Sequence, residues 1–254
     1  MYKVYSNGVA AVNKNSFCVK KGEVFALLGP NGAGKSSMFN IMTLDLKRTS
    51  GDVQVLNTDL DNINVGQQGY LMGMCPQFNT IWNVLSVDQS IAFIGEIKGL
   101  APADIEFQKQ FIKETLDLGA YSNTAAMNLS GGNKRKLICA MSLVGCPKVE
   151  FLDEPTTGVD PVSRRSLFKM LKSLQHSSMI LTTHRMDEAE SLCDNIAIMI
   201  NGRFVCYGST GHLKSTYGQG YSITLKHVQQ KDEFVNWICS SYSFLEYENT
   251  VELD

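Results

Sequence analysis

The spacing of apolar residues alternates between two periods along most of the chain, and this alternation predicts a sheet with helices on its faces. Short apolar runs at residues 24–28, 149–152 and 179–182 have the length of buried strands. Residues 35–46 and the segment after Pro161 instead repeat their apolar positions with helical spacing. Strands that alternate with helices are typical of an α/β fold with a largely parallel sheet.

A purely helical stretch interrupts this alternation at residues 80–128. Ser86 and Gln89 have the spacing of a capping box at the start of a helix over residues 87–98. Pro102 is placed to begin a second helix, which continues to residue 118. Because no strand pattern separates these helices, we expect an inserted helical lobe.

The last part of the chain contains a hairpin signal and then a change of pattern. Asn201 and Gly202 join two strand-like runs, and this dipeptide strongly favours a two-residue β-hairpin. Beyond Gly220 a strand pattern, a helix pattern and a second strand pattern follow one another. We therefore expect a main domain over residues 1–219 and an incomplete βαβ-like unit over residues 220–254.

Composition and charge narrow the class of protein only a little. The 254 residues suffice for a full core, and the formal net charge of -2 gives no general attraction to nucleic acid. Seven cysteines without a C-x-x-C pair are expected to be buried small residues in a reducing compartment. The sequence shows no signal-peptide core and no apolar run near the roughly 18 to 20 residues that cross a bilayer. If the domain functions at a membrane, it would therefore do so through segments absent from this sequence.

A glycine-rich loop between the first predicted strand and helix has the pattern of a phosphate-binding loop. Its eight residues are Gly29, Pro30, Asn31, Gly32, Ala33, Gly34, Lys35 and Ser36. Glycines let successive backbone N–H groups turn toward one centre, and the helix start adds a positive dipole end. Lys35 can face the β- and γ-phosphates, and the Ser36 hydroxyl can ligate Mg²⁺. The alternative is an ordinary glycine turn with a solvated Lys35, which all eight matched positions disfavour.

Two adjacent acids end the predicted strand over residues 149–152. Because side chains alternate along a strand, Asp153 and Glu154 point differently and can hold different roles. Asp153 is placed to bind Mg²⁺, and Glu154 can accept a proton from the water that attacks a γ-phosphate. The alternative is a pair of solvated loop acids before Pro155. Glu150 is unexpected in this predicted buried strand, because a buried charge needs a partner or a position at the edge of the sheet.

A third segment has a helix start that suits an anion. Ser130 can cap a helix whose first amides Gly131 and Gly132 leave uncovered. Three basic residues at positions 134–136 then fall in the early turns, where the helix dipole favours acids. An external anion would suit this arrangement. Taken alone, the segment is better explained as a capped helix with a solvated basic face.

In order and spacing, these segments resemble the nucleotide-binding domain of ABC transporters from Tyr5 to about residue 225. In that family the phosphate loop is the Walker A motif, residues 129–133 match the signature motif, and residues 151–154 match the end of Walker B. The resemblance implies a P-loop NTPase with a mostly parallel sheet core, an antiparallel β subdomain and an inserted helical subdomain. It also implies ATP hydrolysis, with ATP and Mg²⁺ as cofactors.

The resemblance assigns roles to four residues that chemistry alone leaves unmarked. Tyr5 matches the aromatic that stacks on adenine, and Gln77 matches the glutamine that touches Mg²⁺ and the attacking water. Asp160 matches the loop that crosses to a partner domain, and His184 matches the γ-phosphate switch histidine. Each has a plainer alternative: a strand aromatic, a turn residue, a helix cap and a satisfied histidine. Only their joint register favours the functional roles.

More narrowly, several segments resemble subfamily A, whose members mostly move lipids. These are residues 133–136, residues 156–161, and residues 202–204 together with 208–209 and 212–214. Asn133 replaces the glutamine that usually ends the signature, and Ser37 replaces the more usual threonine while keeping a hydroxyl. The unit after Gly220 resembles the start of a regulatory domain.

The family implies a heads-to-tails pair of domains at the cytosolic face of a membrane. ATP held by Lys35 and Ser36 of one domain would be covered by Ser130, Gly131 and Gly132 of the other. The helical lobe at residues 80–128 would transmit closure to transmembrane domains. Two alternatives remain: a soluble cassette ATPase acting on ribosomes or DNA, and a non-catalytic nucleotide-gated module. The near-neutral charge disfavours the first, and the presence of Glu154 with His184 disfavours the second.

Overall fold

The computed structural model describes residues 1–173, 177–218, 237 and 240–241. The chain divides into two units, Met1–Thr216 and Tyr217–Asp254. The strand and helix patterns predicted for residues 220–254 lie almost wholly outside the described residues and stay predictions. The functional residues predicted above all lie in the first unit.

A six-stranded sheet forms the centre of the first unit, with the strand order β10-β9-β3-β8-β7-β6. All neighbours pair in parallel except β9 and β10, which form the antiparallel hairpin expected from Asn201 and Gly202. Both turn residues have positive φ, 48° and 77°, as a two-residue hairpin of the favoured twist requires. The strands are β3 (Val24–Leu28), β6 (Met72–Cys75), β7 (Val149–Asp153), β8 (Ser178–Thr183), β9 (Asn195–Ile200) and β10 (Arg203–Ser209).

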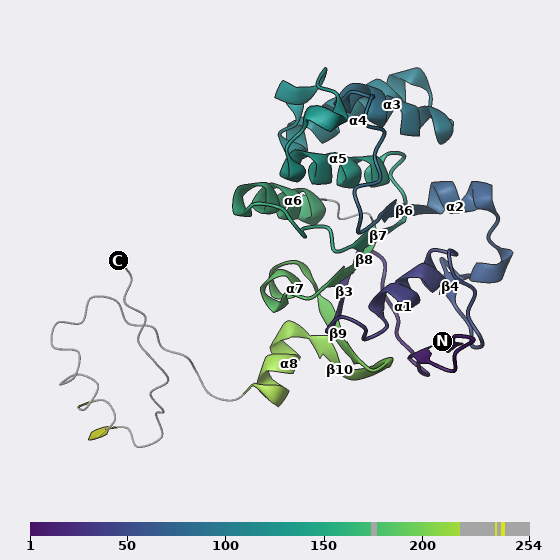
Figure 1. Cartoon of the computed structure of the whole chain (residues 1–254), viewed down its shortest axis with the longest axis vertical. Coiled ribbons are helices and arrows are strands. Elements are labelled where there is room, and N and C mark those ends of the chain that lie inside the picture. Colours follow the sequence, from purple (N-terminus) through teal and green to yellow (C-terminus); the bar gives the residue numbers. More distant parts are fainter. Residues whose placement is uncertain (174–176, 219–236, 238–239, 242–254) are drawn as a thin grey trace. The chain divides into compact units, whose positions relative to one another are not determined.

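Two hydrophobic cores lie on the two faces of this sheet, because successive side chains of a strand point to opposite faces. In β3, Phe25 and Leu27 belong to one core and Ala26 and Leu28 to the other. Helix α1 (Lys35–Met42) packs on the first face, and α6 (Pro161–Ser173) and α7 (Met186–Leu192) cover the second (Figure 1). The runs of residues buried on both faces explain why the strands read as nearly continuous apolar sequence.

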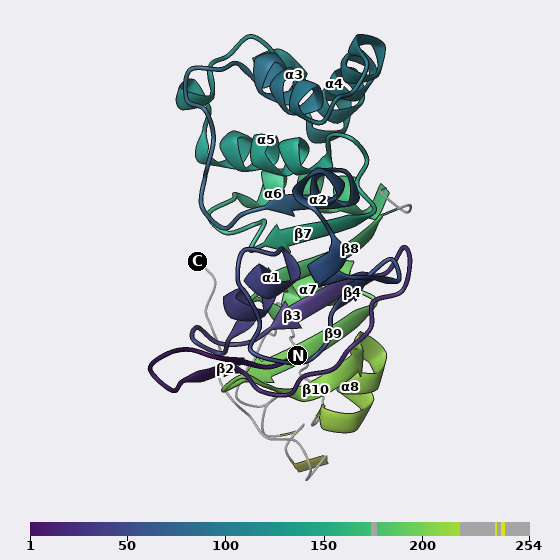
Figure 2. The ribbon, with the colours of Figure 1, turned by 90° about the vertical axis from the view of Figure 1, so that its right-hand side faces the viewer.

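The predicted helical lobe is confirmed, and it lies beyond the β6 end of the sheet (Figure 2). Ser86 and Gln89 form the predicted capping box at the start of α3 (Val87–Ile97). Helix α4 (Pro102–Leu116) ends two residues earlier than predicted, because Asp117 takes a left-handed conformation with φ 55°. Helix α5 (Gly131–Leu143) connects the lobe to the sheet and lies below α3 and α4 in Figure 2.

Smaller elements complete the described fold. Two antiparallel pairs, β1 (Lys3–Val4) with β2 (Ala10–Val12) and β4 (Gln54–Val55) with β5 (Thr58–Asp59), stand apart from the main sheet. The remaining α-helices are α2 (Val65–Leu71) and α8 (Thr210–Tyr217). Three short 3₁₀ turns lie at Leu60–Asn62, Gly119–Tyr121 and Ala126–Asn128. Within the described ranges, no helix is both long and apolar enough to cross a membrane.

The structure differs from two of the sequence predictions. The helix predicted over residues 35–46 ends at Met42, because the Thr43 hydroxyl donates to the Phe39 carbonyl and Leu44 takes a positive φ of 65°. The cysteines are not uniformly buried, since Cys18 and Cys146 are exposed. Cys239 lies outside the described residues.

Candidate functional site

The loop between β3 and α1 forms a cradle that only glycines permit at two positions. Gly34 has a φ of 102°, and a Cβ atom there would collide with the Ala11 carbonyl oxygen. A Cβ atom on Gly29 would collide with the Met199 carbonyl oxygen. No side chain caps α1, and no acid lies in its first turn. The open helix start and the turned backbone are therefore suited to bind phosphate.

Lys35 lies across this loop rather than in solvent. Its Nζ atom donates to the Gly29 carbonyl at 2.7 Å and to the Pro30 carbonyl at 3.0 Å, and the residue is 6% exposed. Burial lowers the pKa of the ammonium from its usual value, while the nearby charges of Glu154 and Asp153 act in the opposite direction. The solvated lysine of the alternative interpretation is wrong for this structure.

The adjacent hydroxyls lie at the open side of the loop. Ser36 is exposed at the start of α1, and Ser37 is half-buried. The Tyr5 hydroxyl lies 3.0 Å from the Ser37 Oγ atom, and the Lys3 ammonium lies 5.3 Å from the centre of the Tyr5 ring. Tyr5 therefore borders the phosphate loop, although its stacking on adenine stays a prediction.

Parallel pairing of β7 with β8 brings Asp153 opposite Thr182. The Thr182 hydroxyl donates a short hydrogen bond to the Asp153 Oδ1 atom. Burial raises the pKa of Asp153, and this hydrogen bond opposes the rise. A carboxylate, a serine hydroxyl and an amide oxygen are the hard oxygen ligands that Mg²⁺ prefers, so Asp153, Ser36 and Gln77 fit the predicted metal by chemistry.

Glu154 is the point at which three of the predicted catalytic residues meet. Its Oε2 atom accepts hydrogen bonds from Gln77 Nε2 at 3.3 Å and from the Thr157 hydroxyl at 3.0 Å. Its Oε1 atom lies 3.5 Å from His184 Nδ1. Glu154 is 8% exposed and has a left-handed backbone with φ 46°, which turns its side chain away from the strand direction. Residues from three separate strand ends thus converge on one carboxylate.

Arg135 organises these strand ends, and sequence analysis missed this function. The residue is 2% exposed, so it is neither part of a solvated basic face nor available to an external anion. Its guanidinium group donates to five backbone carbonyls, of Pro76, Gln77, Asp153, Glu154 and Pro155. The prediction for the basic run is therefore wrong at this position. One cation connects α5 to the loops that hold Gln77 and Glu154.

The start of α5 has the predicted cap and contacts a second predicted site. The Ser130 hydroxyl accepts from Asn133 N at 3.3 Å, and Ser130 and Gly131 are exposed. A Cβ atom on Gly132 would lie 2.9 Å from the Asp160 Oδ2 atom. Among the described residues, no hydrogen bond joins this helix start to the phosphate loop. The described residues therefore show no direct hydrogen bond or ion pair between the two predicted anion sites of one chain.

Asp160 caps its own helix, as the plainer interpretation predicted. Its Oδ1 atom accepts from Val162 N at 3.0 Å and from Ser163 N at 2.9 Å, and these backbone bonds lower the pKa of the exposed carboxyl. A crossing to a partner domain stays a prediction.

Glu150 does not lie at an edge of the sheet, and its polar partners are few. It is completely buried in β7, which has neighbours on both sides. The Ser142 hydroxyl and Lys98 are the groups that favour its charged form, although neither carboxyl oxygen has a hydrogen bond of good geometry within the described structure. Burial raises the pKa of Glu150 well above its usual value, and Lys98 opposes this rise.

The phosphate cradle, the strand-end carboxylates and the parallel sheet together define a P-loop nucleotide-binding protein. The chain belongs to the ABC transporter family, whose model matches residues 12–157. It is an ATPase domain of the ABC type, and it binds ATP. The fold class and the resemblance predicted from the sequence are thereby confirmed.

Several characterised relatives are transporters of subfamily A. The chain is 40% identical over 237 residues to the retinal-specific phospholipid-transporting ATPase ABCA4 of Bos taurus, covering 92% of this chain and 10% of that protein. It is 39% identical over 214 residues to the cholesterol transporter ABCA5 of Mus musculus, covering 83% of this chain and 13% of that protein. The chain therefore spans only about a tenth of the length of these relatives.

Solved structures of bacterial cassettes share the fold. The cbiO1 structure from Clostridium perfringens is 26% identical with a TM-score of 0.76, and the alignment covers 95% of this chain and 93% of that one. The dimeric structure of MJ0796 is 20% identical with a TM-score of 0.75, covering 87% of this chain and 97% of that one. The second likeness shows the fold alone.

Proposed function

We propose that this domain hydrolyses ATP at Glu154 to power the movement of lipid by a membrane transporter. The observation that carries the proposal is the convergence of Gln77 and His184 on Glu154, beside the charge of Lys35. The names of the ABCA4 and ABCA5 relatives, which describe phospholipid and cholesterol transport, support lipid as the substrate class.

Each residue of the site has a role that follows from its chemistry. The loop amides and Lys35 would hold the terminal phosphates, and Ser36, Asp153 and Gln77 would hold Mg²⁺, which would supply neutralisation of the phosphate charge. Glu154 would accept the proton of the attacking water, because it is the carboxylate of the site that its neighbours hold in place and that has no proposed metal role. His184 would contact the γ-phosphate, and Tyr5 would stack on adenine.

A second nucleotide-binding domain is proposed to complete the site. Ser130, Gly131 and Gly132 would cover the ATP bound by the partner domain, with Asp160 at the same face. Two facts support this arrangement: Gly132, two residues after the exposed cap of α5, lies close to Asp160, and a cassette of the same fold has been solved as a dimer. We expect no nucleic-acid partner, since the net charge is -2.

The helical lobe is proposed as the contact with the transmembrane domains at the cytosolic face of the membrane. A cavity of about 630 Å³ lies between the lobe and the sheet, lined among others by Met74, Trp82 and Ile94. Trp82 is stacked edge-on against Phe93, and both keep more than a third of their surface exposed. Exposed apolar surface of this kind is typical of an interface with another protein segment.

The assignment is tested by replacing Glu154 with glutamine, which keeps the size and the hydrogen bonds but removes the base. We expect turnover of ATP to fall by at least about 100-fold, while the affinity for Mg·ATP measured by calorimetry stays within about threefold. Lys35→Ala should instead weaken binding. Glu190→Gln is the matched control, because this half-buried carboxylate of α7 pairs with Lys214 outside the site. Turnover near the wild-type rate in Glu154→Gln would refute the assignment.

A further inference from the structure

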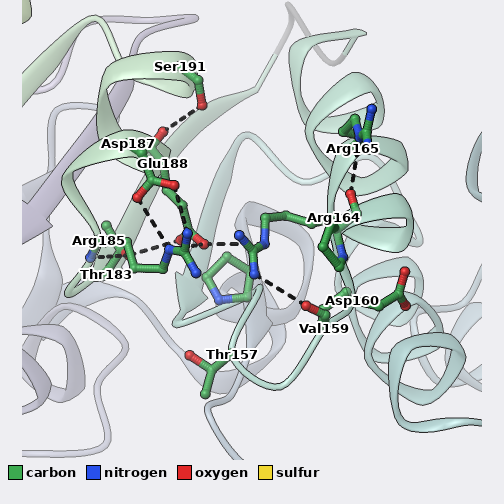
Figure 3. Close-up of polar contacts among 12 residues, drawn as sticks. Thr157, Val159, Asp160, Arg164, Arg165, Thr183, Arg185, Asp187, Glu188 and Ser191 are labelled. Carbon is green, nitrogen blue, oxygen red and sulfur yellow. Dashed lines mark hydrogen bonds and ion pairs between the residues drawn. The ribbon is translucent and has the colours of Figure 1, made fainter. Parts of the chain in front are cut away.

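Glu188 is a buried carboxylate that none of the roles above uses. It lies on α7, is 3% exposed, and its Oε2 atom accepts from the Thr183 hydroxyl at 2.9 Å. Its Oε1 atom has no hydrogen-bond partner within the described structure, although two guanidinium groups face it (Figure 3). The Arg185 Nε atom lies 3.4 Å away and the Arg164 Nε atom 3.6 Å away.

Arg164 joins this carboxylate to a different loop. Its Nη2 atom donates to the Val159 carbonyl at 3.3 Å, immediately before Asp160. Its Nε atom is buried, lacks a hydrogen-bond partner among the described residues and points at Glu188. Figure 3 shows the guanidinium between the two elements, with Asp160 directed away from it. One side chain therefore contacts both the loop before α6 and the carboxylate of α7.

On its other side, Glu188 fixes the backbone that holds His184. The Thr183 hydroxyl that donates to Glu188 also accepts from the Arg185 backbone N–H at 3.1 Å. Residues on both sides of His184 are thus tied to one carboxylate. Because His184 Nδ1 lies 3.5 Å from Glu154 Oε1, a displacement of this segment changes the distance between the histidine and the proposed base.

We propose that Arg164 and Glu188 are a positioning pair that couples the loop at Asp160 to His184. The proposal rests on the proposed function, in which Asp160 faces a second cassette. The Oε1 atom lies between two cations at ion-pair distance and is hydrogen-bonded to neither, so a loop movement of less than about 1 Å brings Arg164 within hydrogen-bond range. Charge-assisted hydrogen bonds are strong in buried surroundings, and such a movement therefore pulls on Thr183 and His184.

The alternative is that Arg164 only neutralises a buried charge. Lysine distinguishes the two, because its single ammonium can compensate Glu188 but lacks the planar fork that reaches the Val159 carbonyl as well. We expect Arg164→Lys to unfold within about 2 °C of the wild type. Its kcat for ATP should nevertheless fall about tenfold, the effect of one lost charge-assisted hydrogen bond, with KM within about twofold.

Two further variants and two controls complete the experiment. Arg164→Gln and Glu188→Gln should each lower kcat about tenfold, and the double variant should be no slower than either, because both remove the same link. Arg165→Gln on the exposed side of α6 and Glu190→Gln on α7 should keep wild-type turnover. ATP turnover is measured on the chain with its partner cassette, at saturating partner.

Several results would overturn the positioning role. A wild-type kcat in Arg164→Lys would show that Arg164 only compensates the charge of Glu188. Losses of kcat that multiply in the double variant would show that the two residues have independent roles. Equal losses of kcat in the Arg164→Gln and Arg165→Gln variants would also rule out a specific positioning role for Arg164. Wild-type protein that neither binds nor hydrolyses ATP would instead refute the proposed function, so the two failures are distinguishable.

Discussion

Replacing Arg135 by methionine should destabilise the domain strongly, because the substitution keeps the apolar stem but removes all five donors. Three of the accepting carbonyls, those of Asp153, Glu154 and Pro155, are bonded in buried surroundings. The other two belong to Pro76 and Gln77, at the edge of the site, where water can replace the guanidinium.

The size of the effect follows from the buried acceptors that lose their donor. The Glu154 carbonyl keeps the Thr157 backbone N–H at 3.2 Å, which leaves the carbonyls of Asp153 and Pro155. A buried carbonyl without a donor costs about 1 to 3 kcal/mol, so two cost roughly 2 to 6 kcal/mol, and the hydrogen bonds lost at the other three carbonyls add to this cost. The variant is also spared the cost of burying a cation, which offsets part of the loss. We therefore expect a net loss of about 2 kcal/mol, equivalent to a fall in Tm of roughly 4 to 8 °C for a domain of this size.

The matched control is Lys134→Met, one residue earlier on the same helix. Lys134 is half-buried, and its side chain has no hydrogen bond within the described structure. Thermal unfolding is followed by circular dichroism without nucleotide, and ATP turnover is measured in parallel. Because Arg135 anchors the loops of Gln77 and Glu154, turnover should fall about 100-fold. An unfolding midpoint for Arg135→Met within 2 °C of that for Lys134→Met would refute the reasoning.

Two other substitutions test single features of the site. Burial raises the folded-state pKa of Glu150, so its proton stabilises the fold below the ordinary pKa of glutamate, and this contribution is lost as pH rises toward the folded-state value. In urea unfolding, Glu150→Leu should therefore be more stable than the wild type by about 2 kcal/mol at pH 8 and by clearly less at pH 4. The same gain in the free energy of unfolding at both pH values would contradict this. Gly34→Ala should lower the affinity for Mg·ATP by more than about tenfold, since its Cβ atom meets the Ala11 carbonyl, whereas Gly69→Ala on α2 has open space and should bind normally. Equal affinities in the two alanine variants would be evidence against a glycine-dependent cradle.

Local sequence signals were sufficient for much of the fold. The capping box of Ser86 and Gln89, the turn at Asn201 and the glycine loop before Lys35 each act within a few residues. A pattern of neighbours in sequence can therefore predict them. The exact end of α1 was not predictable in this way, because the left-handed conformation of Leu44 has no signal in its residue type.

The contacts of the candidate site were only partly predictable. Gln77, Glu154 and His184 could be selected as candidate site residues from their motifs. Their proximity could be expected as well, because the carboxyl ends of parallel strands lie at one edge of the sheet. Arg135 could not be assigned, since its acceptors are backbone carbonyls, which look the same at every position of a sequence. A buried arginine and a solvated one in the same basic run are indistinguishable until the fold is known.

Two buried charges share the task of holding together loops that are far apart in the sequence. Arg135 binds the loops of Gln77 and Glu154 through carbonyls, whereas Glu188 holds the His184 segment through a hydroxyl and two guanidinium groups. The first link is saturated, because all of its contacts are hydrogen bonds at 3.2 Å or less. The second contains contacts of 3.4 and 3.6 Å that still allow adjustment. We therefore expect the loops of Gln77 and Glu154 to be held more firmly than the His184 segment and the loop at Asp160.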